Sequence, residues 1–372
     1  MTHKTIPLGR IIGIPIGLDY SWFLVFILLT WSFAVGYYPQ EFANWSGVTY
    51  WIVGAATAIM LFVSVLIHEL GHSVIAMRYK IAIRNITLFL FGGVAQIASE
   101  PPSAAAEFWI AIAGPVTSFI LAVLFYLSEP VVAAFTPLFG LVKYLAYINL
   151  ALVLFNLIPG FPLDGGRVFR ALVWGMTGSM RKATVVAAGV GRFIAFLFIV
   201  LGVWQIFVGN IGNGLWIAFI GWFLENAASA QVQQTVVQGL LAGHTVSDAM
   251  SRSFTEIPVN VSLQQLVDHQ ILAAGRRVFV VKRYEEVVGL LTLHRVQQVP
   301  RDQWPTTTVE QVMIPADQMK TARPTDELEQ CFSMMNRDGV NQLPVMVNGH
   351  MLGLLTREDV ISFLHTLQEF GR

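Results

Sequence analysis

The sequence His68-Glu69-Leu70-Gly71-His72 lies in an apolar segment that is long enough to cross a membrane. Ionisable side chains are costly in the hydrocarbon core of a bilayer, so a cluster of them there indicates a functional site. Residues i and i+4 of an α-helix face the same direction, so His68 and His72 can bind one metal ion. Two imidazoles are half of a tetrahedral zinc site, and Glu69 can act as a general base toward water. The alternative is a chance H-E-x-x-H on a soluble helix, and the apolar context argues against it.

The composition divides the chain into two parts. Of its 372 residues 55% are hydrophobic and only 12% are charged, about half the charged fraction of soluble proteins. The charges are sparse over residues 11–230, whereas 240–372 has an ordinary soluble composition. The formal net charge is zero, which gives no electrostatic basis for binding nucleic acid. The single cysteine, Cys331, excludes an internal disulfide and a Cys-rich metal site.

The first part contains six apolar segments, each long enough to cross a bilayer. The first is too long for a secretory signal and has no small-x-small cleavage site, so we expect it to remain as a helix. The last two are joined by a Gly/Asn-rich turn over 209–214 and therefore form a helical hairpin. The six segments are 17–37, 51–77, 107–128, 138–158, 185–208 and 211–229.

The basic residues predict the orientation of these spans. Connections on one side carry nearly all of the Lys and Arg residues, while the opposite connections hold Glu41, Glu129 and a single cation, Lys143. The positive-inside rule then places both termini and the C-terminal part in the cytoplasm of a multi-pass inner (plasma) membrane protein. His72 would lie about 10 Å inside the cytoplasmic end of its helix. The basic residues are Lys4, Arg10, Arg78, Lys80, Arg84, Arg167, Arg170, Arg181 and Lys182.

A third metal ligand is expected after the fourth span, in the segment 156–167, which reads N-L-I-P-G-F-P-L-D-G-G-R. Two prolines interrupt the helix, and two glycines let the backbone fold closely around Asp164. Irregular backbone at membrane depth is tolerated where it lines a cavity or packs in protein. Asp164 falls on the same side as His72 and can complete the site. The alternative is a capping aspartate in an ordinary cytoplasmic turn.

A membrane-embedded H-E-x-x-H followed about ninety residues later by N-x-x-P-x-x-P-L-D-G-G resembles the site-2 protease family of intramembrane zinc metalloproteases. The resemblance covers about residues 10–230. It implies one Zn²⁺ per chain bound by His68, His72 and Asp164, with Glu69 activating the attacking water. It also implies that Asn156 contacts the substrate backbone or the oxyanion, although a helix–helix hydrogen bond is the alternative. The expected substrate is a single-span membrane protein, such as an anti-sigma factor, in regulated intramembrane proteolysis.

The segment 86–97 has a Gly92-Gly93 turn between two short apolar arms, which predicts a membrane-associated β-hairpin. In the family such a segment offers an edge strand to an unwound substrate. A packing element without substrate contact remains the alternative. In the third span, Ala113-Gly114-Pro115 predicts a close approach between helices at Gly114.

The C-terminal part contains a duplication. Residues 245–250 recur as 308–313, and residues 289–296 recur as 353–360. Each unit is predicted to contain two helices and two strands, which resembles a tandem pair of cystathionine-β-synthase (CBS) repeats. Such repeats often hold adenine nucleotides and can join two chains into a homodimer.

The second repeat carries the ribose-binding pattern of the CBS family, T-x-x-D, at Thr356 and Asp359. The first repeat keeps Thr292 but has Arg295 in place of the aspartate, so at most one half-site is expected. The alternative is that Thr356 and Asp359 only cap a helix.

We therefore expect a polytopic α-helical membrane protein of six spans with a short β-hairpin, followed by a soluble α/β tandem CBS domain. The expected function is an intramembrane zinc endopeptidase regulated by its CBS repeats. The alternative is a CBS-regulated metal or ion transporter, which would use the ligands but would not need Glu69 as a base. The expected domains are 1–230 (membrane), 231–243 (linker), 244–300 (first repeat) and 306–366 (second repeat).

Overall fold

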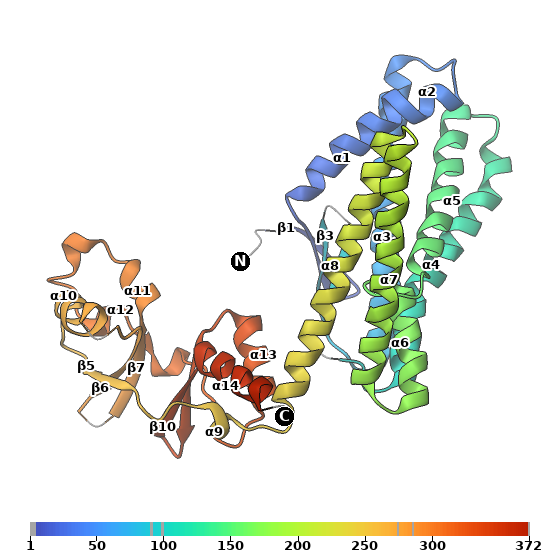
Figure 1. The fold of residues 1–372 in the computed structure, drawn as a ribbon. Coiled ribbons are helices and arrows are strands. Elements are labelled where there is room, and N and C mark those ends of the chain that lie inside the picture. The colour runs from blue at the N-terminus through green and yellow to red at the C-terminus, as the bar shows by residue number, and fades with distance from the viewer. Residues whose placement is uncertain (1–4, 90–91, 98–99, 274, 285, 371–372) are drawn as a thin grey trace. The chain divides into compact units, whose positions relative to one another are not determined.

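The computed structural model describes residues 5–89, 92–97, 100–273, 275–284 and 286–370. They form two compact units, Met1–Thr235 and Val236–Arg372 (Figure 1). Lys4 and residues 90–91 of the expected hairpin lie outside the described residues.

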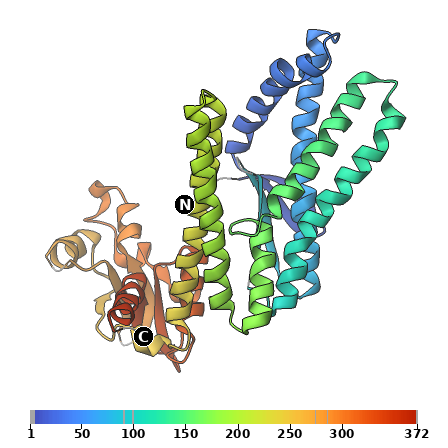
Figure 2. The same cartoon turned by 45° about the vertical axis from the view of Figure 1, so that its right-hand side comes forward.

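Long apolar helices form most of the first unit (Figure 2). Among the described residues, five helices are long and apolar enough to cross a membrane, which confirms the predicted membrane class. The first is continuous through a π-helical turn at Ser32–Tyr37. The five are Ser21–Glu41, which contains α1 (Ser21–Trp31) and α2 (Tyr38–Glu41), then α3 (Gly47–Arg78), α4 (Ala104–Val132), α5 (Thr136–Asn156) and α7 (Met180–Phe207).

The sixth expected span, 211–229, is helical and forms the first part of α8 (Ile211–Leu241). Asn213, Glu225 and Asn226 lower its hydropathy, so it is not one of the five most apolar helices. α8 packs closely on α7, since a Cβ on Gly221 would lie 2.7 Å from the carbonyl oxygen of Ala195. The predicted hairpin of the last two helices is therefore present.

A four-stranded sheet lies beside α3. The predicted hairpin forms β3 (Ile83–Phe89) and β4 (Gly92–Ile97), and the order of the sheet is β1-β2-β3-β4. The predicted turn at Gly92-Gly93 is wrong, because both glycines belong to β4 and pair with Phe89 and Leu88 of β3. The sequence analysis did not predict β1 (Ile6–Ile11) or β2 (Ile14–Leu18), which delay the start of the first helix to Ser21. Strand β2 pairs with β3 in parallel, and buried isoleucines of both strands, Ile16 and Ile86, pack against α3.

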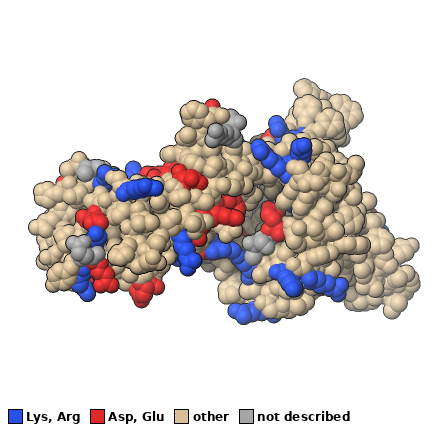
Figure 3. Space-filling view, turned by 90° about the horizontal axis from the view of Figure 1, so that it is seen from below, with Lys and Arg blue, Asp and Glu red and all other residues tan. Residues whose placement is uncertain are grey.

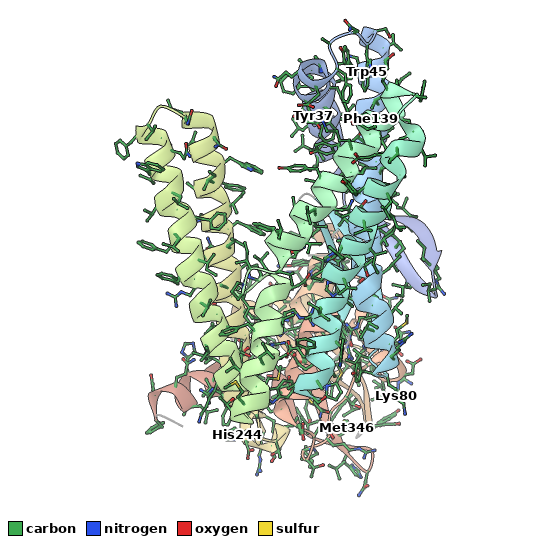
Figure 4. The ribbon with its side chains drawn as sticks, turned by 90° about the vertical axis from the view of Figure 1, so that its right-hand side faces the viewer. Tyr37, Trp45, Lys80, Phe139, His244 and Met346 are labelled. Carbon is green, nitrogen blue, oxygen red and sulfur yellow. The ribbon has the colours of Figure 1, made fainter. Side chains whose placement is uncertain are left out.

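The two ends of this unit differ in chemistry. Figure 4 shows Tyr37, Trp45 and Phe139 at one end and Lys80 at the other. At the aromatic end, the fully buried Tyr38 shares a hydrogen bond of 2.6 Å with Thr57 of α3. Stacked rings such as Phe42 on Trp45 fix the connection between α2 and α3.

The second unit contains two similar α/β repeats. In each repeat, two antiparallel strands are followed by a helix: β6 and β7 precede α11, and β9 and β10 precede α14. There are two buried cores, and each takes residues from both repeats: Val246 packs in the core of the second repeat and Val309 in that of the first. The elements are α9 (Val246–Ala249), β5 (Thr255–Pro258), α10 (Leu263–Leu266), β6 (Val278–Arg283), β7 (Glu286–Thr292), α11 (Leu293–Gln297), α12 (Val309–Val312), β8 (Ile314–Pro315), α13 (Leu328–Asp338), β9 (Gln342–Val347), β10 (His350–Thr356) and α14 (Arg357–Glu369).

The duplicated segments exchange partners between the repeats. A Cβ on Gly289 of β7 would lie 2.7 Å from the sulfur of Met313, and a Cβ on Gly353 of β10 would lie 3.1 Å from the sulfur of Met250. Met250 and Met313 end the two copies of the duplicated hexapeptide. The hexapeptide at the start of each repeat therefore packs on the hairpin of the other repeat.

Candidate metal centre

Three potential ligand atoms meet at one point in the first unit. Nε2 of His68 and Nε2 of His72, one turn apart on α3, are separated by 3.2 Å. Oδ2 of Asp164 lies 3.1 Å from the first nitrogen and 3.2 Å from the second. Both imidazoles are buried. Among the described residues, these three form the only group of this kind.

The close fold around Asp164 brings its carboxylate to the histidines. α5 ends at Asn156, the chain crosses the Pro-rich loop, and α6 (Asp164–Thr177) begins at the aspartate itself. A Cβ on Gly165 would lie 2.4 Å from the carbonyl carbon of Leu157, and one on Gly166 would lie 2.3 Å from that of Gly160. No other residue fits these contacts, so the predicted role of the two glycines agrees with the structure.

The dimensions of this cluster suit a tetrahedral metal ion. Zinc binds imidazole nitrogen and carboxylate oxygen at about 2.0–2.2 Å, so two ligand atoms in a tetrahedral site are about 3.3 Å apart. The three measured separations, 3.1 to 3.2 Å, are close to that value. Two nitrogens and one oxygen leave a fourth position open, as catalytic zinc sites require.

One face of α4 holds the two imidazoles in place. Nδ1 of His72 donates a hydrogen bond of 2.7 Å to the carbonyl oxygen of Ile110, and Nδ1 of His68 lies 2.9 Å from Oγ of Ser118. The contact with the carbonyl oxygen puts the ring proton of His72 on Nδ1, and the hydroxyl of Ser118 can accept the corresponding proton of His68, so that each Nε2 lone pair faces the cluster. Between the two contacts, Gly114 presents bare backbone to both rings.

A cavity of about 420 Å³ opens beside the cluster. Glu69, the residue between the ligands, lines it together with Asn156, Gly92 and Gly93. A Cβ on Gly93 would lie 2.6 Å from Cγ of Glu69, so strand β4 runs directly against the glutamate side chain. All the site residues predicted for the membrane domain therefore border one space.

Several residues of this site were not identified from the sequence. Ser118 lies four residues after Gly114, and that spacing on one helix face was the available signal. Aromatic residues of α8, including Trp216 and Phe219, form a wall of the cavity, although they have the composition of any membrane helix. Arg170 was interpreted as a cytoplasmic surface charge, but it is buried and pairs with the buried Glu107 of α4.

The residues expected to bind a nucleotide form a capping box. Oδ2 of Asp359 accepts a hydrogen bond of 2.9 Å from the backbone N–H of Thr356, and Oγ1 of Thr356 accepts one of 3.1 Å from the N–H of Asp359. Thr245 with Asp248 and Thr308 with Gln311 form capping boxes at two other helices. A role of Thr356 and Asp359 toward a nucleotide stays a prediction.

Comparisons with known proteins agree with this geometry. The model of "Peptidase family M50" matches residues 56–132 and 131–200, and that of "CBS domain" matches residues 309–366. Rip3 of Mycobacterium tuberculosis is 35% identical over 363 residues, 96% of this chain and 92% of that protein. The protein sll0528 of Synechocystis is 34% identical over 372 residues, 98% of this chain and 96% of its own length. The solved site-2 protease of Methanocaldococcus jannaschii is 29% identical, with a TM-score of 0.42, over 61% of this chain and 95% of that one.

The fold and the site define a multi-pass membrane protein whose helical unit contains a His₂Asp cluster that can hold a metal ion. The chain belongs to peptidase family M50, the site-2 proteases, and carries a C-terminal CBS pair. It is therefore a zinc metalloprotease, as predicted from the paired motifs.

Proposed function

We propose that this protein hydrolyses a peptide bond within a transmembrane segment of another membrane protein, with His68, His72 and Asp164 as its zinc ligands. One observation carries the proposal: the three ligand atoms lie within 3.2 Å of one another beside a cavity that Glu69 lines. A transporter would need the ligands but would have no use for a carboxylate base next to them.

Each residue of the cavity has a role in this reaction. A zinc ion bound by the three ligands supplies a Lewis acid that activates water near neutral pH and polarises a carbonyl group. Glu69 accepts the proton of the attacking water and later delivers it to the leaving nitrogen. Asn156, at the end of α5 on the cavity wall, donates its amide N–H to the substrate backbone or to the oxyanion.

The substrate is a single-span membrane protein, for which an anti-sigma factor is the expected example. Its helix must unwind before a peptide bond can reach the site. Strand β4 is an edge strand of the four-stranded sheet, and Gly92 and Gly93 place its backbone on the cavity. An extended substrate segment can pair with this edge and present its backbone beside Glu69.

The active site faces the cytoplasmic side in this proposal. Arg78 ends α3, and Arg181 and Lys182 begin α7, so these cations follow and precede membrane helices at the same end as Lys80. Figure 3 shows Lys and Arg side chains on the lower face of the membrane unit. By the positive-inside rule this end and both termini are cytoplasmic, in the inner (plasma) membrane.

The tail is the regulatory part of the proposal, with the domains placed at 1–230, 231–243, 244–300 and 306–366. An adenine nucleotide bound near Thr356 and Asp359 would change the cleavage rate, and pairing of the tails would form a homodimer. Such coupling requires different ligand affinity in the active and inactive states, typically worth about 1–3 kcal/mol.

The proposal is tested with detergent-purified full-length protein and a single-span test substrate. We expect cleavage by the wild type, no cleavage by Glu69→Gln or after zinc chelation, and normal cleavage by Glu129→Gln, whose carboxylate lies at the far end of α4. Cleavage that persists in Glu69→Gln would refute the assignment of the base. Metal uptake into vesicles that survives Glu69→Gln, without any cleavage by the wild type, would favour the transporter.

A further inference from the structure

A second group of buried charges lies between α4 and α6. Glu107 is fully buried and Arg170 is 4% exposed. Nε of Arg170 donates a hydrogen bond of 2.7 Å to Oε1 of Glu107, and its Nη2 donates to the same oxygen. Arg167, one turn earlier on α6, has its Nε 3.9 Å from that oxygen. Two guanidinium groups therefore share one buried carboxylate.

Arg170 has partners on two sides. Its guanidinium lies 5.2 Å from the ring centre of Phe161, which is buried in the loop that leads to Asp164. Nη2 of Arg170 also lies 3.9 Å from Glu100, but that carboxylate is 44% exposed. Arg170 thus clamps α6 and its preceding loop to α4, and it neutralises Glu107.

Arg167 is held differently. Its side chain is 20% exposed and lines the same cavity as Glu69 and Asn156. Within the described residues, no group accepts a hydrogen bond from its guanidinium. Its carboxylate neighbour, Glu107, is bound by Arg170 through Oε1, while the buried Oε2 of Glu107 has no hydrogen-bond partner there. An arginine with unused donors inside a membrane protein is costly, which indicates a functional site.

We propose that Arg167 binds the oxygen of the scissile carbonyl group and holds it as negative charge accumulates there. This inference rests on the proposed function. The guanidinium offers N–H groups in a planar fork that matches carboxyl oxygens, and donors placed where charge develops are most effective in a cavity that excludes water. The partner is thus any substrate peptide group at this position, whatever its side chain.

The reaction step balances without a further reactant. Water adds its oxygen to the carbonyl carbon while Glu69 accepts one proton, and the electron pair of the C=O double bond moves to the oxygen near Arg167. That pair returns, the C–N bond breaks, and the proton passes from Glu69 to the leaving nitrogen. The second proton of the water leaves the new carboxylic acid for the product amine, the oxygen then belongs to the carboxylate of the product, and Arg167 remains protonated throughout.

The kinetic test uses Arg167→Gln and Arg167→Lys in the full-length protein, with Arg181→Gln as the control at an exposed position of α7. We expect Arg167→Gln to lower kcat about 10²- to 10³-fold, with KM changed less than about threefold. The kcat of Arg167→Lys should lie between those of the wild type and Arg167→Gln, because lysine keeps the positive charge but lacks the planar pair of N–H donors. A kcat of Arg167→Gln within about threefold of the wild type, with normal zinc content, would overturn the proposal.

A binding measurement separates this proposal from the proposed function. In the inactive Glu69→Gln background, an apolar peptide ending in a free carboxylate is compared with the same peptide ending in an amide. We expect the Glu69→Gln protein to bind the carboxylate peptide with about tenfold or higher affinity than the amide peptide. The additional substitution Arg167→Gln should remove that preference. Equal preference in both proteins would overturn the role of Arg167. A wild type that cleaves nothing, yet shows the Arg167-dependent preference, would contradict the proteolytic function alone.

Discussion

A Cβ atom on Gly114 would lie 2.1 Å from Nε2 of His72 and 2.6 Å from Nε2 of His68. No side chain can occupy that position, so the backbone of α4 itself forms the floor under the two imidazoles. The contact between α3 and α4 is equally close one residue before His72, where a Cβ on Gly71 would lie 2.4 Å from Oγ1 of Thr117. The geometry of the metal centre therefore depends on two glycines that carry no functional group.

The first prediction concerns Gly114→Ala. The added methyl must displace the histidine rings, so bound zinc should fall to a small fraction of the wild-type content. Gly189→Ala in α7 is the matched control, because a Cβ there meets no atom within 4 Å. Elemental analysis of both purified variants tests this. Full zinc occupancy in Gly114→Ala would show that Gly114 does not contact the two imidazoles as described.

The second prediction concerns the ligands. His68→Ala, His72→Ala and Asp164→Ala should each lose zinc, since three protein ligands are the minimum for a catalytic site. Glu69→Gln should retain zinc and lose cleavage, because the base is not a ligand. Metal content and activity are measured on the same preparations. Full occupancy in Asp164→Ala would exclude it as the third ligand.

The third prediction concerns Ser118, which orients His68. Removing an outer hydrogen-bond partner of a metal-bound histidine typically costs about 10- to 100-fold in metal affinity, and we expect a loss of this size for Ser118→Ala. Ser128→Ala, on the same helix, is the control, because it removes a hydroxyl that donates to the backbone oxygen of Phe125 and contacts no residue of the cluster among the described ones. Zinc affinity is measured by competition with a chelator. Equal affinities in the two variants would assign Ser118 to packing alone.

The fourth prediction concerns orientation. Cys331 is the single cysteine of the chain; it is 2% exposed, and burial raises the pKa of its thiol to about 11. The unmodified protein should therefore resist thiol reagents at pH 7 to 8, because little thiolate is present. In that background, a membrane-impermeant maleimide should label Asn44→Cys from outside intact cells and should spare Arg181→Cys. The reverse pattern would overturn the positive-inside assignment.

The fifth prediction separates the capping role of Asp359 from nucleotide binding. Asp359→Ala and Asp248→Ala each remove the carboxylate of a capping box, so each should destabilise the tail by about 1 kcal/mol. If Asp359 also accepts hydrogen bonds from the ribose hydroxyls of a nucleotide, only Asp359→Ala should weaken ATP binding to the full-length protein. Calorimetry that detects no ATP, ADP, AMP or S-adenosylmethionine binding to the wild type would leave the tail as a dimerisation or docking module.

The membrane class and the ligand cluster were predictable because both follow from local spacing. Apolar segments of bilayer length and two histidines at i and i+4 need no knowledge of distant contacts. Asp164 was predictable because Pro159, Pro162 and the glycines that follow it leave few ways for the chain to continue. The duplication in the tail was predictable for the same reason, since its copies can be aligned directly.

The remaining features depend on long-range contacts. Strand β2 pairs with β3 across about seventy residues, and Ile14–Leu18 on its own reads as the start of an apolar helix. Arg170 and Glu107 are separated by 63 positions, so nothing local distinguishes this buried pair from ordinary interfacial charges. Thr356 and Asp359 show a different limit, because a helix cap and a ribose site require the same residues at the same spacing.

The residues that form the candidate metal centre and the residues that form the apolar lining of its cavity belong to different elements. The ligands and the groups that orient them come from α3, α4 and α6, whereas β4, α5 and α8 supply the apolar surface opposite. A compound that only chelates zinc would address features that every zinc enzyme offers. An inhibitor selective for this protease would therefore need, beside a zinc-binding group, an apolar extension that fits against Trp216, Phe219 and Phe223 of α8.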